Sequence, residues 1–225
     1  VHTGYLHTEL GCRNAVAGLG RHLLGGGVPG VNILTRSHVY LLEAIDRVVA
    51  GNPALASQIE LHLAGILSSS DVDASAGSTV VRTHGYLPHG ETVNLVRCAN
   101  LLFLPMHDLP AGKRATIVPG KTYEYLASGR PILAALPDGD ARDLLTRAGT
   151  AFVCRPDDVS SMAEVIAGQV ERVRTGGPAP LLRHGVLAPY ERRNLTEQLA
   201  RVFDAVVDGR AGATRDRALQ ADVAG

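Results

Sequence analysis

A lysine and a glutamate stand one helical turn apart in the stretch VPGKTYEYLASGRPILA, residues 118–134. The stretch predicts a short helix that begins near Gly120 and ends at Gly129, followed by a buried strand. The first amides of a helix lack intrahelical partners and its dipole favours anions, so Lys121 would complete a phosphate site. Glu124 lies further along, where its carboxylate can accept hydrogen bonds from two neighbouring hydroxyls of a sugar ring. The pattern therefore indicates a ribose diphosphate ligand.

Short apolar runs alternate with longer segments of helical period along the chain. The expected strands are residues 1–3, 60–64, 79–83, 101–105, 132–136 and 151–153. Besides the helix after Gly120, the expected helices are residues 37–51, 91–99, 139–149, 157–176 and 194–207. This alternation predicts an α/β fold with a doubly wound, Rossmann-like parallel sheet. Ligands of such sheets bind beyond the carboxyl ends of the strands, so the loops that follow the strands are the candidate sites.

Three of these loops carry residues suited to a binding site. The first strand is followed by Gly4, which allows a close backbone approach, and by Tyr5. The third strand leads into HGYLPHGE, in which His84 and His89 lack a third ligand for a metal. We therefore expect these histidines to be polar loop residues and expect no metal site. The fourth strand leads into residues 105–121, a long loop rich in glycine and proline that ends at the predicted helix.

The 225 residues predict one domain over residues 1–208, with an insertion at about residues 5–34 and a disordered tail at 209–225. The insertion contains the glycine-rich stretch GLGRHLLGGGVPG, which interrupts the alternation of strands and helices. The chain begins VHTGYL, without a methionine or a signal-peptide pattern, and we expect it to be part of a longer protein.

Composition excludes several classes of function. The formal net charge is zero, which gives no electrostatic case for binding nucleic acid or an anionic membrane. No run approaches the roughly 20 apolar residues of a transmembrane helix. Cys12, Cys98 and Cys154 are odd in number and far apart, so neither a disulfide framework nor a metal site is expected. We expect a cytoplasmic protein, which the rest of a longer chain could attach peripherally to a membrane.

The block PGKTYEYLASGRP, residues 119–131, closely resembles a segment of retaining glycosyltransferases with the GT-B fold, the glycosyl transferases group 1. Weaker resemblance extends from about residue 35 to residue 207 and includes TRSHVYLLEAIDRV, GYLPHGETVNLVRCANLLFLP, DGDARDLL and RPDDVSSMAEVIA. GT-B enzymes pair two Rossmann-like domains. The resemblance implies that this chain is the C-terminal, donor-binding half, and that an N-terminal, acceptor-binding domain lies outside it.

The resemblance also implies roles for individual residues. In the family, the glutamate that matches Glu124 binds the donor ribose. The residues implied to bind the donor diphosphate are Arg36, Gly120, Lys121 and Thr122. The implied contacts to the nucleotide base are Gly85, Tyr86 and Leu87, with Gly4 and Tyr5 near the loop after the first strand. These roles come from the family pattern and not from the spacing of the residues.

The chain departs from the family pattern in two places. Thr116 stands where many relatives carry a second glutamate, so contacts to the donor sugar ring are not carried over. The basic residue that usually follows the first strand's glycine is displaced, and Arg13 is an alternative to Arg36 for the diphosphate.

The expected function is transfer of a sugar from a uridine or guanosine diphosphate to an unknown acceptor, without a metal cofactor. The expected partners are the donor and the chain's own N-terminal domain, and the isolated domain is expected to be inactive. Two alternatives remain open: a non-catalytic module that binds a nucleotide or a partner, and an enzyme like the sugar-nucleotide epimerases. A dinucleotide redox domain does not fit, because no G-x-G-x-x-G follows the first strand.

Overall fold

The computed structural model describes residues 1–14, 30–183 and 185–222. The chain divides into two compact units, Val1–Arg183 and His184–Gly225. We expected one domain through residue 208, whereas the first unit ends at Arg183. The segment that follows its last helix carries Pro178 and Pro180, which cannot continue a helix.

The first unit contains two parallel sheets of three strands each, in the orders β1-β2-β3 and β4-β5-β6. The strands are β1 (His2–Thr3), β2 (Leu61–Ala64), β3 (Val81–Gly85), β4 (Leu102–Pro105), β5 (Ile132–Ala135) and β6 (Ala151–Cys154). Two hydrogen bonds of 2.8 Å join the sheets, one from the Phe103 amide to Val1 O and one from the Val1 nitrogen to Leu101 O. The strands therefore follow the order β3-β2-β1-β4-β5-β6, which reverses direction between β1 and β4.

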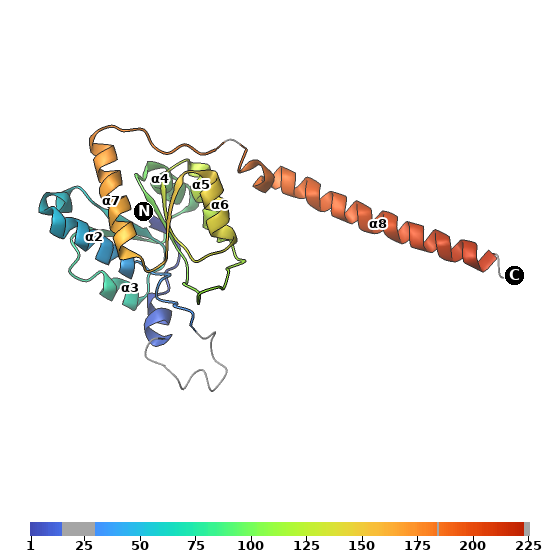
Figure 1. Cartoon of the computed structure of the whole chain (residues 1–225), viewed down its shortest axis with the longest axis horizontal. Helices are drawn as coiled ribbons and strands as arrows, with labels where there is room; N and C mark the ends of the chain where they lie inside the picture. The colour runs from blue at the N-terminus through green and yellow to red at the C-terminus, as the bar shows by residue number, and fades with distance from the viewer. Residues whose placement is uncertain (15–29, 184, 223–225) are drawn as a thin grey trace. The chain divides into compact units, whose positions relative to one another are not determined.

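Helices cover both faces of this sheet, α2, α3 and α7 on one side and α4, α5 and α6 on the other (Figure 1). Their bounds are α2 (Val39–Gly51), α3 (Ser69–Ala74), α4 (His89–Cys98), α5 (Gly120–Ser128), α6 (Asp140–Ala148) and α7 (Val159–Arg174). The arrangement confirms the predicted α/β, Rossmann-like fold class. Helix α3 was not predicted because it is only one and a half turns long. A capping box between Ser68 and Asp71 stabilises its start.

Alternate residues of the central strands pack against opposite helical layers, as the two-residue period of a strand requires. Phe103 and Leu133 belong to the core cluster that includes residues of α2 and α7. Leu102 and Leu104, which alternate with Phe103, are also fully buried. The short apolar runs of the sequence are therefore strands buried on both faces, as expected of a parallel sheet.

The second unit contains the helix α8 (Arg192–Asp222). Its exposed apolar side chains recur at helical spacing, and include Leu195, Leu199, Val202, Phe203 and Val206. The helix continues to Asp222 through most of the segment at 209–225 for which we expected a disordered tail. That segment contains several alanines and arginines, which are strong helix formers, and no proline.

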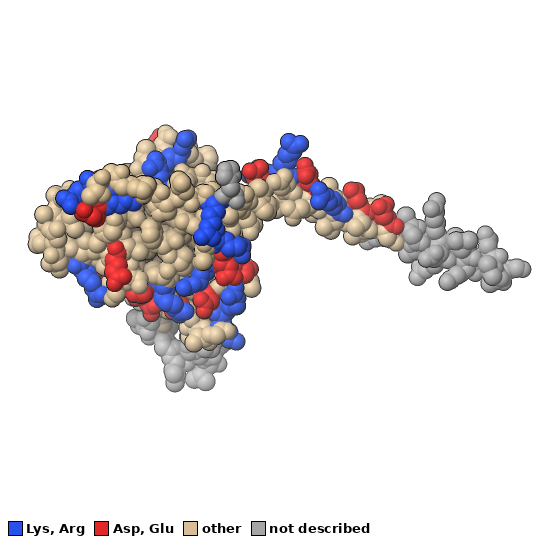
Figure 2. Space-filling model, turned by 45° about the horizontal axis from the view of Figure 1, so that its top comes forward, with Lys and Arg blue, Asp and Glu red and all other residues tan. Residues whose placement is uncertain are grey.

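The expected insertion at residues 5–34 is described in part. Residues 8–14 are helical, residues 30–34 form a loop, and residues 15–29 lie outside the described residues. No helix in the described part of the chain is long and apolar enough to cross a membrane. On the face of the molecule in Figure 2, basic and acidic side chains are interspersed, in agreement with the zero net charge.

Candidate functional site

Helix α5 is attached to the end of β1 by a buried tyrosine. The Thr3 amide donates a hydrogen bond of 3.0 Å to the Tyr125 hydroxyl, which also lies 3.2 Å from Thr3 Oγ1. Tyr125 is fully buried, and burial raises the pKa of its phenol to about 12, so the hydroxyl keeps its proton. The contact fixes the helix at the point between β1 and β4 where the strand order reverses, the usual ligand site of an open α/β sheet.

Lys121 lies one turn before Tyr125 and reaches the same strand end. Its amine donates a hydrogen bond to the Thr3 carbonyl and lies 3.4 Å from His2 Nε2. Gly4 has a φ of 95°, and a Cβ atom there would stand 3.1 Å from Lys121 Nζ. A glycine therefore suits both the left-handed backbone and the space that the lysine occupies. Burial, followed by the charge of Arg36, lowers the pKa of Lys121 to about 8, while Glu124 acts in the opposite direction.

Arg36 supplies a second positive charge beside Lys121. Its side chain is partly buried, and this burial lowers the pKa of the guanidinium from its ordinary value. Among the residues that the structure describes, no carboxylate forms an ion pair with Arg36 or Lys121. The alternative candidate, Arg13, is exposed and lies 3.7 Å from Glu9 on its own helical segment. Arg36 and Lys121 thus form a positive centre without a carboxylate ion pair among the described residues.

The long loop between β4 and α5 is held at both ends. Near β4, Asn32 and Asp108 exchange backbone hydrogen bonds of 3.0 and 3.1 Å, and Arg155 contacts the Asp108 carboxylate at 2.7 and 2.9 Å. Near α5, Ala115 pairs with the segment at Gly139, where a Cβ atom would stand 2.1 Å from the Ala115 oxygen. These contacts hold the loop on the β4 side and at Ala115, five residues before α5 begins.

The start of α5 has free space in front of it. Its N-cap is Pro119, and among the described residues no side chain caps this end. Gly120 is exposed, and nothing lies within 4 Å of the place where its Cβ would stand. The start of the helix at Gly120 is therefore open to an anion, while the Thr122 amide is already bonded to Pro119 O.

A cavity of about 250 Å³ opens beside Lys121 at this edge of the sheet. It is lined by six of the predicted site residues, namely Gly4, Tyr5, Tyr86, Leu87, Lys121 and Glu124. Glu124 is exposed but lies on the wall of the cavity, so it does not point into open solvent away from a cleft. The loops after β1 and β3 and the first turns of α5 thus meet at one site.

The other predicted residues lie outside this lining. The charge of Arg36 lowers the pKa of Lys121, one of the lining residues. Gly85 is the last residue of β3, and its carbonyl accepts a hydrogen bond of 2.8 Å from the Gly65 amide. Thr122 is fully buried, its amide donates to Pro119 O, and its hydroxyl has no partner among the described residues. In this conformation the Thr122 side chain therefore faces the protein interior. Thr116, at the position of the second family glutamate, is exposed.

Sequence reasoning missed part of the cavity wall. Gly65 and Ile66 come from the loop after β2, and Thr92 comes from α4. The glycine that directly follows the second strand was an available signal, since the loops after parallel strands meet at one edge. Thr92 carries no such signal, because its approach depends on how α4 packs.

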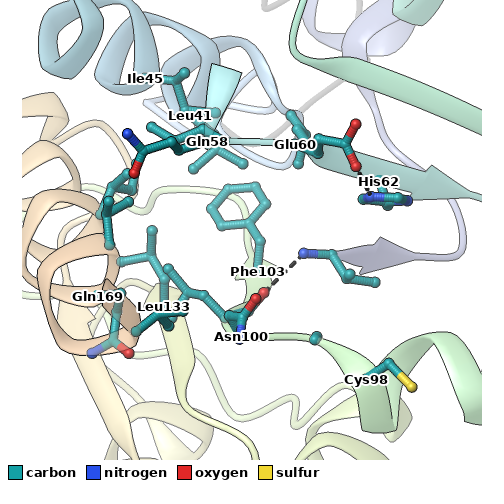
Figure 3. A pocket seen from close by; sticks show the side chains of 18 of the residues that line it. Leu41, Ile45, Gln58, Glu60, His62, Cys98, Asn100, Phe103, Leu133 and Gln169 are labelled. Atoms are coloured by element: carbon teal, nitrogen blue, oxygen red, sulfur yellow. Dashed lines mark hydrogen bonds and ion pairs between the residues drawn. The ribbon is translucent and has the colours of Figure 1, made fainter. Parts of the chain in front are cut away.

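A larger cavity of about 570 Å³ lies at the opposite edge of the sheet, where β1, β2 and β4 begin (Figure 3). Its walls are mainly apolar and come from α2, α4 and α7, and Phe103 and Leu133 line it. The Glu60 carboxylate lies 3.2 Å from His62 Nε2 at its rim. None of the described residues that line it is a predicted site residue.

The fold and the site together define a Rossmann-like domain with a positive, anion-accessible helix start at the reversal of strand order. Within the described residues, no group of three or more His, Cys, Asp or Glu side chains is arranged to hold a metal ion. The family model described as glycosyl transferases group 1 matches residues 32–171, well over half of the chain. The chain belongs to this family.

The chain is similar to several solved structures at low sequence identity. The pneumococcal O-GlcNAc transferase GtfA, in complex with UDP and GlcNAc, has a TM-score of 0.53 and 8% identity over 92% of this chain and 35% of its own. HepE (Alr3699) from Anabaena, in complex with UDP and glucose, has a TM-score of 0.48 and 17% identity over 71% of this chain and 44% of its own. Alpha,alpha-trehalose 6-phosphate synthase from Burkholderia multivorans has a TM-score of 0.47 and 15% identity, with coverage of 76% and 41%. The chain spans less than half of each of these proteins, and no curated protein sequence matches it.

Proposed function

We propose that this chain binds the nucleoside diphosphate sugar of a retaining glycosyltransferase in the cavity of about 250 Å³ beside α5. The observation that carries the proposal is the placement of Lys121 and Glu124. Both line that cavity, and Lys121 also contacts the end of β1. A cation and a carboxylate one helical turn apart match the diphosphate and the ribose of such a donor.

In this proposal the diphosphate lies at the start of α5, between Arg36 and Lys121. The amides of the first turn and the two cations would bind its oxygens by charge-assisted hydrogen bonds. Glu124 would accept hydrogen bonds from the ribose hydroxyls. Tyr86 and Leu87, which follow β3 in the same cavity wall, would contact the base.

The same groups would assist the reaction. Negative charge grows on the diphosphate as its bond to the sugar breaks, and a preorganised positive site stabilises that charge. Arg36 and Lys121 provide the positive charge of this site. The proposed reaction therefore needs no metal. The acceptor would be bound by a second, N-terminal domain of the whole protein. The present chain would bind the donor and transfer nothing by itself.

Isothermal titration calorimetry tests the proposal. The chain is titrated with UDP and GDP, and then with UDP-glucose and GDP-mannose, because GtfA was solved with UDP and a guanosine diphosphate is the other expected donor. The proposal predicts binding of at least one nucleotide, and weaker binding by Glu124→Ala. A folded chain that binds none of the four ligands would contradict it and favour a partner-binding module.

A further inference from the structure

Two histidines that the proposed donor contacts do not use lie beside the positive centre. His7 Nδ1 and His107 Nε2 are 2.8 Å apart, so one imidazole donates a hydrogen bond to the other. The ring centroids are 4.9 Å apart, and both side chains are partly exposed. His7 follows β1 and His107 follows β4, so the pair bridges the two loops at the reversal of strand order.

The backbone links this pair to Arg36, because the His7 amide donates a hydrogen bond of 2.9 Å to Arg36 O. Burial lowers the pKa of His7, and the charges of Arg36 and Lys121 lower it further, against the opposing effect of Asp71 on α3. Burial, His7 and Arg36 together lower the pKa of His107 to about 4. The pair is therefore uncharged near pH 7, first because both rings are partly buried and second because of the charge of Arg36.

The carboxylates around the pair are few or already engaged. Asp108, the next residue after His107, is bound by Arg155 from the end of β6. Asp71 accepts hydrogen bonds from the amide and hydroxyl of Ser68 within its capping box. On α5, the charge of Glu124 acts to raise the pKa of Lys121. A pair of bases next to two cations is thus ready to accept a proton when an added anion cancels the neighbouring positive charge.

We propose that the His7–His107 pair is a third basic component of the diphosphate subsite, and that it takes up a proton when a nucleoside diphosphate sugar binds. The inference rests on the function proposed above and names positioning residues for that ligand. The proton moves from solvent to the free imidazole nitrogen that faces away from the shared hydrogen bond. The N–H···N contact is retained and gains one positive charge.

The sign of the effect follows from linkage. An anion beside the pair raises the histidine pKa values in the complex above those in the free chain. Between the free and bound values the complex holds more protons, so the affinity increases as the pH falls. Lys121 is charged throughout the range from pH 5 to 7, because its pKa is about 8, and it adds no proton uptake there.

The test is calorimetry with UDP-glucose and GDP-mannose, whose diphosphate diesters do not titrate in this range. Titrations at pH 5.5 and 7.0, in buffers of different ionisation enthalpy, give both the affinity and the number of protons taken up. We expect net proton uptake at pH 5.5 and an affinity roughly three- to tenfold higher than at pH 7.0. In the double variant His7→Gln/His107→Gln, the uptake and the pH dependence should both disappear.

The second histidine pair of the chain provides a matched control. His62 Nδ1 and His84 Nε2 are also 2.8 Å apart, but this pair is next to Glu60 on the β2–β3 surface. The variant His62→Gln/His84→Gln should keep the proton uptake of the wild type. Binding without proton uptake, or with equal uptake in the His7/His107 variant, would overturn this inference and leave the proposed function intact. Absence of binding at both pH values would overturn the proposed function, and this inference with it.

Discussion

The amine of Lys121 donates a hydrogen bond to the carbonyl of Thr3, and so joins the first turn of α5 to the end of β1. These residues are 118 positions apart in the chain. The contact places a cation at the reversal of strand order, where parallel α/β sheets bind ligands. It also holds the cation next to Gly4, so that a diphosphate at this point would meet both a positive charge and the exposed helix start at Gly120.

Replacing Lys121 by methionine should weaken nucleotide binding, because methionine preserves the buried stem and removes the charge. The loss of a charge-assisted hydrogen bond predicts a Kd for UDP that is roughly 10- to 100-fold higher. The matched control is Lys113→Met, since Lys113 is an exposed lysine of the preceding loop. Equal affinities for UDP in these two variants, measured by calorimetry, would remove Lys121 from the site.

The affinity for the donor should also fall above pH 8. Lys121 has a pKa of about 8 in the free chain, and a bound diphosphate raises that pKa because it stabilises the charged amine. Binding at higher pH must therefore add a proton to the amine, which lowers the affinity by up to about tenfold per pH unit. The measurement is the Kd for UDP-glucose from pH 7 to 9.5.

The variant Lys121→Arg separates this effect from titration of the nucleotide base. Arginine remains charged over the whole range, so the base alone can change the affinity of this variant. If the Kd for UDP-glucose changes with pH as little in the wild type as in Lys121→Arg, the assignment of the titration to Lys121 is contradicted.

Removing the Tyr125 hydroxyl should destabilise the fold. In Tyr125→Phe the Thr3 amide loses its acceptor in a buried position, which predicts a decrease of about 1–3 kcal/mol in the free energy of unfolding. Urea denaturation measures this change. Tyr86→Phe is the control, because the Tyr86 side chain is 79% exposed. If Tyr125→Phe unfolds at the same urea concentration as the wild type, the link between α5 and β1 does not contribute to stability.

The sheet could be predicted from the sequence because each strand is a short apolar run buried on both faces. Every strand of the structure overlaps a predicted run, and the long helices follow their apolar periodicity. The boundary after Arg183 could not be predicted, because α8 has the same local pattern as a helix that packs on the sheet. Its place in a separate unit depends on tertiary contacts, which local periodicity does not encode.

The cavity could be predicted in outline because parallel strands end at one edge. Gly4, Tyr86 and Glu124 come from distant segments, and they line one cavity because their segments follow β1, β3 and β4. The contacts that support it could not be predicted. The Asp108–Arg155 ion pair and the His7–His107 hydrogen bond join residues 47 and 100 positions apart, and both depend on how the loops pack.

The proposed donor site depends most on Glu124 as the residue that binds the ribose. The direct test is a double cycle by calorimetry, with wild type and Glu124→Ala against UDP and 2′-deoxy-UDP, and with Glu91→Ala as an exposed control on α4. If Glu124 binds the ribose, losing either the carboxylate or the 2′-hydroxyl weakens binding by roughly 1–3 kcal/mol, and losing both weakens it little further. Unchanged affinity of Glu124→Ala for UDP, or two losses that simply add, would contradict it.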